Sequence, residues 1–451
     1  DPMSDRSTGP LAGYRQFLSL RGDVFVLSVA MFAFSLGFQM TTRFLPRYLE
    51  VLGASALVIG LFSTFGNLIS AVYPYPGGMV SDRIGSRYAL TLFGLASTLG
   101  FGFWLVAPSF GTITVAGITI QPWLWVFVGL VLAQAWKSFG LGATFAIVKQ
   151  SAEPSQLARG FASTETFRRS AFLLGPVLAA GLLTLHPRFE LSFRYVLAVA
   201  LIFGAVATAV QHFYYDASDD SFGDSFAGVD QIRADIQEMP STLRPLLIGD
   251  TLVRFANGMV YAFFIIVVTS ALDSDVTIPL GVVGSPSLSP DAFFGLLLGV
   301  EMVIALLVMA PAAAMAERVG LKPVVATGFA VYAVFPILLI SAPATVGVLV
   351  VLFAVSGLRF AGLPAHKALI VGPAEAGAGG RVTGSYYLLR NVIVIPSGAL
   401  GGALYGGVAN PIGPGQLIPE SPLLAFGLAT VIGLGGTGYF LAFGEEFAAY
   451  R

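Results

Sequence analysis

Three long stretches without any charged residue constrain the fold of this chain more than any other feature. They cover 49 residues at 88–136, 36 residues at 323–358 and 24 residues at 421–444. A single helix needs about 20 apolar residues to cross a bilayer. Each stretch is long enough to do so, and we therefore predict an integral membrane protein.

Composition supports this prediction and excludes several functional classes. Hydrophobic residues make up 56% of the chain and charged residues only 11%, against about 25% charged residues in ordinary soluble domains. The formal net charge of −1 gives no basic excess for binding nucleic acid. The chain has 0 cysteines, which excludes disulfides and thiolate metal sites. Because we also find no His/Asp/Glu cluster and no phosphate-binding loop, we expect no metal, no cofactor and no enzymatic activity.

Cutting the sequence at charges, prolines and glycine clusters gives twelve apolar spans. The 53 glycines and the lack of an alternating pattern favour helices packed through small residues. The predicted fold is an all-α membrane protein with two six-helix bundles. We assign 1–21 to a cytoplasmic segment, 22–215 to the N-terminal bundle, 216–244 to an acidic linker with one short amphipathic helix, and 245–445 to the C-terminal bundle. The spans are 22–49, 54–80, 88–107, 122–149, 158–184, 191–215, 245–272, 291–316, 323–342, 344–371, 379–407 and 421–444.

The distribution of Lys and Arg outside the spans predicts the orientation. With a cytoplasmic N-terminus, fourteen of these residues fall in inner loops and tails, and only Arg47, Arg188 and Arg194 fall in outer loops. Positive charge accumulates on the cytoplasmic side of membrane proteins. We therefore expect a multi-pass protein of the plasma membrane with both termini and the linker in the cytoplasm.

The two halves repeat each other. The run Asp82-Arg83-Ile84-Gly85 after the second span returns as Glu317-Arg318-Val319-Gly320 after the eighth, at an offset of 235. Four further charged pairs share an offset of 222, namely Lys137 with Arg359, Glu153 with Glu375, Arg159 with Arg381 and Arg168 with Arg390. A duplicated half is typical of transporters whose binding site lies between the repeats.

The run from Gly78 to Arg87 resembles the loop 2–3 signature of the major facilitator superfamily of secondary transporters, and the run from Glu317 to Lys322 resembles its degenerate copy in loop 8–9. The resemblance covers nearly the whole chain. It implies alternating access and a conformational hinge on the cytoplasmic side. The predicted hinge residues are Gly78, Asp82, Arg83, Gly85, Arg87, Glu317, Arg318 and Gly320.

A second resemblance leaves an alternative open. The run from Leu174 to Gly181 is similar to an element of proton-coupled antiporters, although alanines replace two of its glycines. The 37 phenylalanines are compatible with lipophilic cargo, but lipid-facing helices are also rich in Phe. A multidrug/proton antiporter is therefore the alternative function. A channel or a membrane enzyme, from another class, is disfavoured.

Charged residues deep inside the spans are the candidates for function, because a charge at the bilayer centre costs about 2.5–3.5 kcal/mol even on lenient scales. Counted along each helix, the deepest lie roughly 14–21 Å into the membrane. They all fall on spans that the resemblance places around or beside the central cavity. These residues are Lys137, Arg168, Arg169, Arg254, Glu301, Arg359 and Arg390.

Structural explanations compete with functional ones for some of these charges. Asp250 and Arg254 are four residues apart on one helix and can neutralise each other. Arg168 and Arg390 flank the cavity and can brace the two halves. Arg43 is predicted to reach the outer interface. His366 and Lys367, near the inner end of the tenth span, are predicted to face lipid headgroups.

The remaining residues form the predicted substrate site, which consists of Lys137, Arg254, Asn257 and Arg359. Six basic and three acidic residues at depth give a positive interior, which favours an anion. Glu301 is either the residue that carries a coupled proton or a counter-ion of Arg254 or Arg359, and Asp250 has the same two possible roles. We therefore predict a monomeric transporter of a small organic anion, coupled to protons and surrounded by membrane lipids.

Overall fold

The computed structural model describes residues 22–73, 80, 83–151, 157–214, 233–234, 236–272, 274–278, 286–373 and 379–450. Most of these residues are helical. Three short antiparallel hairpins interrupt the helices, and the longest pairs Ile113 with Ile120. The predicted N-terminal segment 1–21 and most of the predicted linker lie outside the described residues.

The described residues of the first half form six long helices and their connections. The elements are α2 (Gly22–Thr41), α3 (Leu45–Val51), α4 (Ala56–Val72), α6 (Ser86–Val106), η1 (Ala107–Phe110), β1 (Ile113–Val115), β2 (Ile118–Ile120), α7 (Trp123–Ser151), α8 (Leu157–Leu183) and α9 (Phe189–Tyr214).

The second half has more interruptions within its spans. Its first elements are η3 (Ser241–Leu243), α11 (Arg244–Val260), η4 (Tyr261–Phe263), α12 (Phe264–Ala271), β3 (Val276–Thr277), β4 (Ser287–Leu288), α13 (Pro290–Val319) and α14 (Leu321–Ser341). The remaining elements are α15 (Val346–Gly357), η6 (Leu358–Phe360), α16 (Leu363–Val371), α17 (Gly379–Val394), α18 (Ser397–Gly406), β5 (Val408–Ala409), β6 (Gln416–Ile418), α19 (Pro422–Phe443) and η7 (Ala448–Tyr450).

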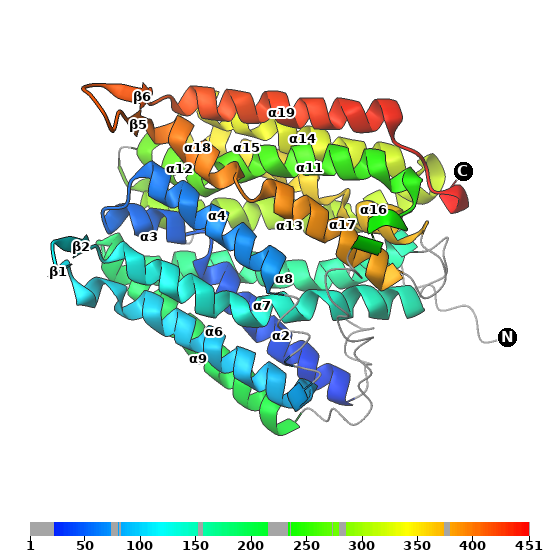
Figure 1. Ribbon diagram of the computed structural model, residues 1–451, viewed down its shortest axis with the longest axis horizontal. Helices are drawn as coiled ribbons and strands as arrows, with labels where there is room; N and C mark the ends of the chain where they lie inside the picture. The colour runs from blue at the N-terminus through cyan, green and yellow to red at the C-terminus, as the bar shows by residue number, and fades with distance from the viewer. Residues whose placement is uncertain are drawn as a thin grey trace.

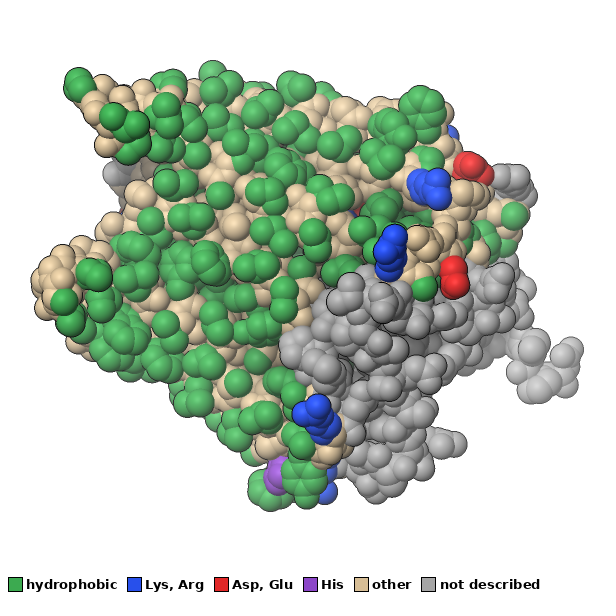
Figure 2. Space-filling view, in the orientation of Figure 1, with side chains coloured by type: hydrophobic (Ala, Val, Ile, Leu, Met, Phe, Trp, Pro, Cys, Tyr) green, Lys and Arg blue, Asp and Glu red, His purple; other side chains and the backbone are tan. Residues whose placement is uncertain are grey.

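The described helices have the length and apolar character required to cross a membrane. Eight of the segments are long enough, and four shorter apolar helices accompany them, which is consistent with the twelve spans expected. Figure 2 shows hydrophobic side chains spread over most of the visible face, with the charged side chains gathered toward one end. The protein is therefore a multi-pass membrane protein with an apolar belt.

The helices group into two bundles that pack side by side (Figure 1). In the first, α2 packs against α9, and α6 packs against α7 and α9. In the second, α11 and α14 both pack against α19. The bundles meet where α8 packs along α13 and α16, and where α4 packs along α18. Hairpins β1–β2 and β5–β6 lie at one end, here named the hairpin end, and η7 lies at the opposite end (Figure 1).

Close backbone contact joins the two bundles along α4 and α18. A Cβ atom on Gly60 would lie 2.2 Å from the carbonyl oxygen of Gly398, and one on Gly402 would lie 2.5 Å from the carbonyl oxygen of Ala56. Only glycine permits such an approach. The glycines of these helices thus explain how the halves pack so closely near the hairpin end.

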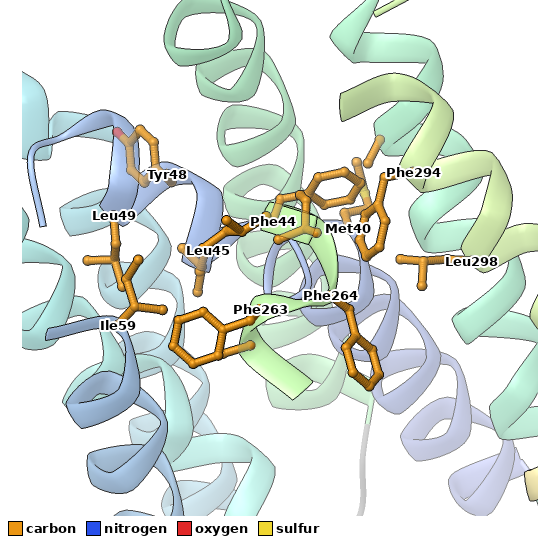
Figure 3. Packing of buried hydrophobic residues seen from close by; sticks show 14 of the residues in the cluster. Met40, Phe44, Leu45, Tyr48, Leu49, Ile59, Phe263, Phe264, Phe294 and Leu298 are labelled. Carbon is orange, nitrogen blue, oxygen red and sulfur yellow. The ribbon is translucent and has the colours of Figure 1, made fainter. Parts of the chain in front are cut away.

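An apolar cluster closes the hairpin end between the bundles (Figure 3). Phe44 of the first half meets Phe294 of α13 edge to face, with ring centroids 5.9 Å apart. Around this cluster, Arg47 of α3 forms an ion pair with Asp291 of α13 at 3.2 Å. Arg43 donates a hydrogen bond to the hydroxyl of Tyr261. The two halves are therefore tied together at this end.

The internal repeat is visible in the backbone. Gly85 has φ 84° and ψ 153° just before α6, and Gly320 has φ 94° and ψ 163° just before α14. Both residues lie in the positive-φ region, where a side chain is strained. The repeat predicted at an offset of 235 therefore has the same local structure in both halves.

Candidate functional site

A buried ion pair lies inside the C-terminal bundle. Nη2 of Arg359 is 2.6 Å from Oε1 of Glu301, and both side chains are only 1% exposed. Ser356 of α15 donates a hydrogen bond to the same carboxylate oxygen. Glu301 comes from α13, so the pair connects α13 to the short turn η6.

The interruption of the helix explains how Arg359 reaches this position. Pro364 in the first turn of α16 has no N–H to continue the hydrogen bonding of α15. The chain passes through η6 instead, and Arg359 extends from this turn. A Cβ atom on Gly357 would lie 2.5 Å from the carbonyl oxygen of Glu301. The close approach of α15 to α13 therefore holds the turn near Glu301.

A second charged cluster surrounds Asp250 of α11, whose side chain is fully buried. Nη1 of Arg390 lies 3.1 Å from Oδ2 of Asp250, and the hydroxyl of Tyr386 donates to the same oxygen at 3.0 Å. Nε of Arg254 lies 3.4 Å from Oδ1. Nε2 of His366 lies 3.4 Å from Oδ2. Helices α11, α16 and α17 thus converge on one carboxylate.

Tyr332 of α14 connects the two clusters. Its hydroxyl accepts a hydrogen bond from Nη1 of Arg254 at 3.4 Å. The guanidinium carbons of Arg254 and Arg359 each lie 5.0 Å from the centre of its ring. Phe360 continues this stack, because its ring lies 4.7 Å from Arg359 and 4.4 Å from Arg169 of α8. Arginines and aromatic rings therefore alternate from the C-terminal bundle to the N-terminal bundle.

A small cavity lies beside this stack. Its free volume of about 10 Å3 is enough for about one water molecule. Nε and Nη1 of Arg359 are buried and have no hydrogen-bond partner, although buried donors are normally satisfied. The residues that line the cavity are Arg254, Val325, Gly328, Phe329, Tyr332, Arg359, Gly362, Leu363 and His366.

The charges of the two clusters do not balance. Three arginines, Arg254, Arg359 and Arg390, face two carboxylates, Asp250 and Glu301. With His366 neutral, these groups leave one excess positive charge. An unbalanced buried charge is costly, so the clusters are suited to binding an anion.

The predicted site residues do not all come together. Arg254 and Arg359 share the cavity, whereas Lys137 of α7 lies in the N-terminal bundle with Nζ 6.0 Å from the ring centre of Phe38. Asn257 is half-buried on α11, and its Oδ1 has no hydrogen-bond partner. The side chain of Arg168 lies outside the described set. Glu301 forms an ion pair with Arg359, which is the arrangement that the counter-ion interpretation describes.

Three structural expectations were wrong. His366 and Lys367 do not face the headgroups, because they are 2% and 6% exposed inside the bundle. Their turn of α16 packs against α14, α17 and α8. Arg43 does not reach the outer interface, because it is 9% exposed and its guanidinium carbon lies 4.1 Å from the ring centre of Tyr261.

Sequence reasoning missed several members of the site. Tyr332, Ser356, His366 and Tyr386 are polar groups on three spans other than those of Asp250 and Glu301, and no spacing relates them to these two carboxylates. One signal was present, because Tyr386 and Arg390 are four residues apart and must share a helix face. Both of them contact Asp250.

The predicted hinge is described only in part. Gly78 and Asp82 lie outside the described residues. Arg83, Glu317 and Arg318 are exposed at helix ends, whereas Nε of Arg87 donates to the backbone carbonyl of His212 at 2.7 Å and connects α6 to the end of α9. In the described part of the chain, no three His, Asp or Glu side chains form a metal-binding group.

The fold and the charged interior define a class, that of multi-pass membrane transporters. The family model described as Major Facilitator Superfamily matches residues 27–280. The chain belongs to this superfamily, and it is a transporter rather than an enzyme.

Similar proteins agree with this assignment. An uncharacterized MFS-type transporter of Mycobacterium tuberculosis (strain ATCC 25618 / H37Rv) is 28% identical over 185 residues, which are 41% of this chain and 40% of the relative. A second strain, CDC 1551 / Oshkosh, has a putative uncharacterized MFS-type transporter with the same 28% identity over 185 residues. The chain thus spans about 40% of the length of the curated relatives it matches.

Solved structures share the fold at low sequence identity. The nucleoside transporter NupG has a TM-score of 0.65 at 14% identity and covers 92% of this chain and 98% of its own. The human organic anion transporter MFSD10 (TETRAN) has a TM-score of 0.58 at 14% identity, with 93% and 99% covered. A POT family transporter in complex with 5-aminolevulinic acid has a TM-score of 0.66 at 12% identity, with 93% and 95% covered.

Proposed function

We propose that the protein is a proton-coupled secondary transporter that moves a small organic anion across the plasma membrane by alternating access. The excess of buried arginine over carboxylate in the C-terminal bundle carries this proposal. A cargo that brings one negative charge would balance the cluster, whereas a cationic cargo would increase the imbalance. Orientation with both termini in the cytoplasm and function as a monomer are parts of the same proposal.

The contacts between the bundles support alternating access. The apolar cluster and the Arg47–Asp291 pair hold the hairpin end closed. If the termini are cytoplasmic, the hairpin end faces outward, and this conformation is closed to the outside. Loss of these contacts would let the halves rock about the midplane. The hinge role of the runs around Gly85 and Gly320 belongs to this proposal.

The cargo site combines Arg254 and Arg359 with contacts from Asn257 and, across the interface, Lys137. Of these two arginines, Arg254 is the more accessible, because its side chain is 25% exposed while that of Arg359 is 1% exposed. The anion therefore meets Arg254 first. Arg359 can bind the anion once its ion pair with Glu301 has broken. Asp250 pairs with Arg254 and holds it in position. Arg390 in turn pairs with Asp250.

A matched set of ligands tests the sign of the cargo. Benzoate, benzamide and benzylammonium have similar shapes and differ in charge. A ligand that binds only the folded protein stabilises it by about 2.7 kcal/mol at 100 times its dissociation constant. We expect benzoate alone to raise the unfolding temperature of the purified protein. Stabilisation by benzylammonium alone would reject the anion proposal and favour the multidrug/proton antiporter.

Coupling is tested by transport in proteoliposomes. A proton-coupled carrier accumulates the anion when a pH gradient is imposed, and it exchanges labelled for unlabelled anion without a gradient. We expect both activities in the wild-type protein. Exchange without gradient-driven accumulation would show an uncoupled transporter and remove the proton from the proposal.

A further inference from the structure

We infer that the cavity beside Arg359 binds an anionic group no larger than a halide ion or one carboxylate oxygen, and that His366 takes up a proton together with it. This inference rests on the proposed function and identifies the residue that couples the two ions. It differs from the assignment of the proton to Glu301.

The cavity is suited to an anion by its donors and its size. Arg254, Arg359, Tyr332 and His366 line it. Arg359 has two buried nitrogens without a partner, while its residue is only 2% exposed. Water could accept hydrogen bonds from these nitrogens, but only an anion also balances the excess positive charge. The volume of about 10 Å3 leaves room for a halide or the tip of a carboxylate.

His366 is placed between this cavity and Asp250. It lines the cavity, and its Nε2 lies 3.4 Å from Oδ2 of Asp250 and 3.3 Å from the hydroxyl of Tyr386. Phe329 covers the imidazole from one side, with ring centroids 5.6 Å apart. A proton on His366 can therefore form an ion pair with Asp250 without leaving the bundle.

The charges around His366 link the proton to the anion. Protonation alone would raise the excess positive charge of the clusters from one to two. An anion in the cavity cancels one of these charges, so each ion binds more readily when the other is present, and the effect is reciprocal. His366 contacts Asp250 and Tyr386, and it shares the cavity lining with Arg254, Tyr332 and Arg359. One contact further away, Arg390 pairs with Asp250 and Glu301 pairs with Arg359. The other charged residues described on α16 and on α8, which packs against it, are Lys367 and Arg169.

The linkage is measured on the full-length protein with three sodium salts at constant ionic strength. Chloride and acetate fit the cavity as an ion and as a carboxylate, and hexafluorophosphate, which is larger than a halide and has no carboxylate, is the bulky control. Their affinities are determined from unfolding temperatures between about pH 5 and pH 8, the range in which histidine titrates. We expect the affinity for chloride or acetate to fall by up to about tenfold per pH unit as His366 loses its proton.

Substitution identifies the titrating group. His366→Asn should abolish the pH dependence of anion affinity, whereas the matched control His186→Asn, in a turn where Nδ1 accepts from the backbone N–H of Arg188, should retain it. Binding of chloride alone would assign the cavity to an inorganic anion, and binding of acetate would assign it to the carboxylate of the cargo. Either result supports the inference. An unchanged pH dependence in His366→Asn, or equal stabilisation by hexafluorophosphate, would overturn it.

A second measurement does not require any change to His366. The chain has 3 histidines, so the double variant His186→Asn/His212→Asn leaves His366 as the only imidazole for NMR titration. Saturating chloride or acetate should move its titration midpoint to higher pH, and an unmoved midpoint would contradict the inference. If benzoate is transported but His366 shows no linkage, this inference fails while the proposed function stands. If chloride shifts the titration of His366 but no organic anion is transported, the proposed function fails while this inference stands.

Discussion

The two bundles share a fold but differ in how they satisfy their buried polar groups. In the described interior of the N-terminal bundle, Trp136 donates to Gln211 at 3.3 Å, and Gln211 donates to the backbone carbonyl of Leu90 at 2.7 Å. These are bonds between neutral groups. The C-terminal bundle instead buries Asp250 and Glu301 among arginines. Among the described side chains, the difference indicates that the buried carboxylates and their arginines are concentrated in the second bundle, while the first contributes neutral bonds and the buried cations Arg43 and Arg169.

Aromatic packing strengthens this contrast. Phe34 stacks on Trp136 in the N-terminal bundle with ring centroids 4.3 Å apart and contributes apolar area without charge. In the C-terminal bundle, Tyr332 and Phe360 stack on guanidinium groups instead. Such cation–π contacts contribute about 2 kcal/mol when desolvated. Aromatic residues of the C-terminal bundle therefore support its buried arginines, and Arg169 of the N-terminal bundle joins them through Phe360.

The largest expected effect comes from Glu301→Gln, because this change leaves Arg359 buried without a carboxylate. We expect the free energy of unfolding to fall by about 3–5 kcal/mol. Denaturation in mixed micelles measures it. Glu50→Gln is the control, because the side chain of Glu50 is 35% exposed and pairs with Arg47 at the surface. The control should change stability by less than about 1 kcal/mol.

Replacing both members of the buried pair sharpens this test. The variant Glu301→Met/Arg359→Met removes both charges, so we expect it to recover at least half of the stability lost by Glu301→Gln. Wild-type stability in the single variant would contradict the view that this pair is an essential feature of the second bundle. If His366 is the coupling group, Glu301→Gln protein that does fold should still respond to the pH gradient.

Paired substitutions of one polar group compare the bundles directly. Tyr386→Phe removes a hydrogen bond to the buried carboxylate of Asp250, and such charged bonds contribute about 1.5–3 kcal/mol. Tyr48→Phe removes a neutral bond to the carbonyl of Trp104, worth about 1 kcal/mol. Unfolding free energies of the two variants test the contrast. Equal losses, or a larger loss for Tyr48→Phe, would oppose it.

The smallest effect on stability is expected where the bundles touch at the hairpin end. The side chains of Arg47 and Asp291 are 29% and 11% exposed, so Asp291→Asn should cost about 1 kcal/mol or less. It should nevertheless favour opening of this end. Since the chain has 0 cysteines, Leu298→Cys places a single thiol in the apolar cluster. Labelling of that thiol should become faster with Asp291→Asn, and an unchanged rate would mean that the ion pair does not hold the closed state.

The sequence predicted most of the architecture because the bilayer imposes simple rules on it. The long uncharged stretches predicted the helices, and the repeat at Gly85 and Gly320 predicted two related halves with similar local backbone. Their depth within the predicted spans was enough to identify Arg359 and Glu301 as candidates for function. Their pairing at 2.6 Å remained one of two open interpretations, because Glu301 could have met either Arg254 or Arg359.

The rest of the site depends on packing between distant spans. His366 was assigned to the headgroup region because position along a helix was the only measure of depth. The helix is interrupted at η6, and α16 then packs against α14 and α17. His366 is therefore buried. Tyr332 and Ser356 carry no charge and no motif, so their approach to the arginines appears only in three dimensions.

The affinity of Arg254→Gln and Lys137→Gln for the same anion tests the central claim most directly, because Arg254 belongs to the charged cluster of the C-terminal bundle and Lys137 is the candidate cation of the N-terminal bundle. Losing a charge-assisted bond to the cargo costs about 1.5–3 kcal/mol, which is roughly 10- to 150-fold in affinity. Titration calorimetry with benzoate should show such a loss for Arg254→Gln and a clearly smaller one for Lys137→Gln. A large loss for Lys137→Gln with unchanged affinity in Arg254→Gln would contradict the assignment of anion recognition to the C-terminal bundle.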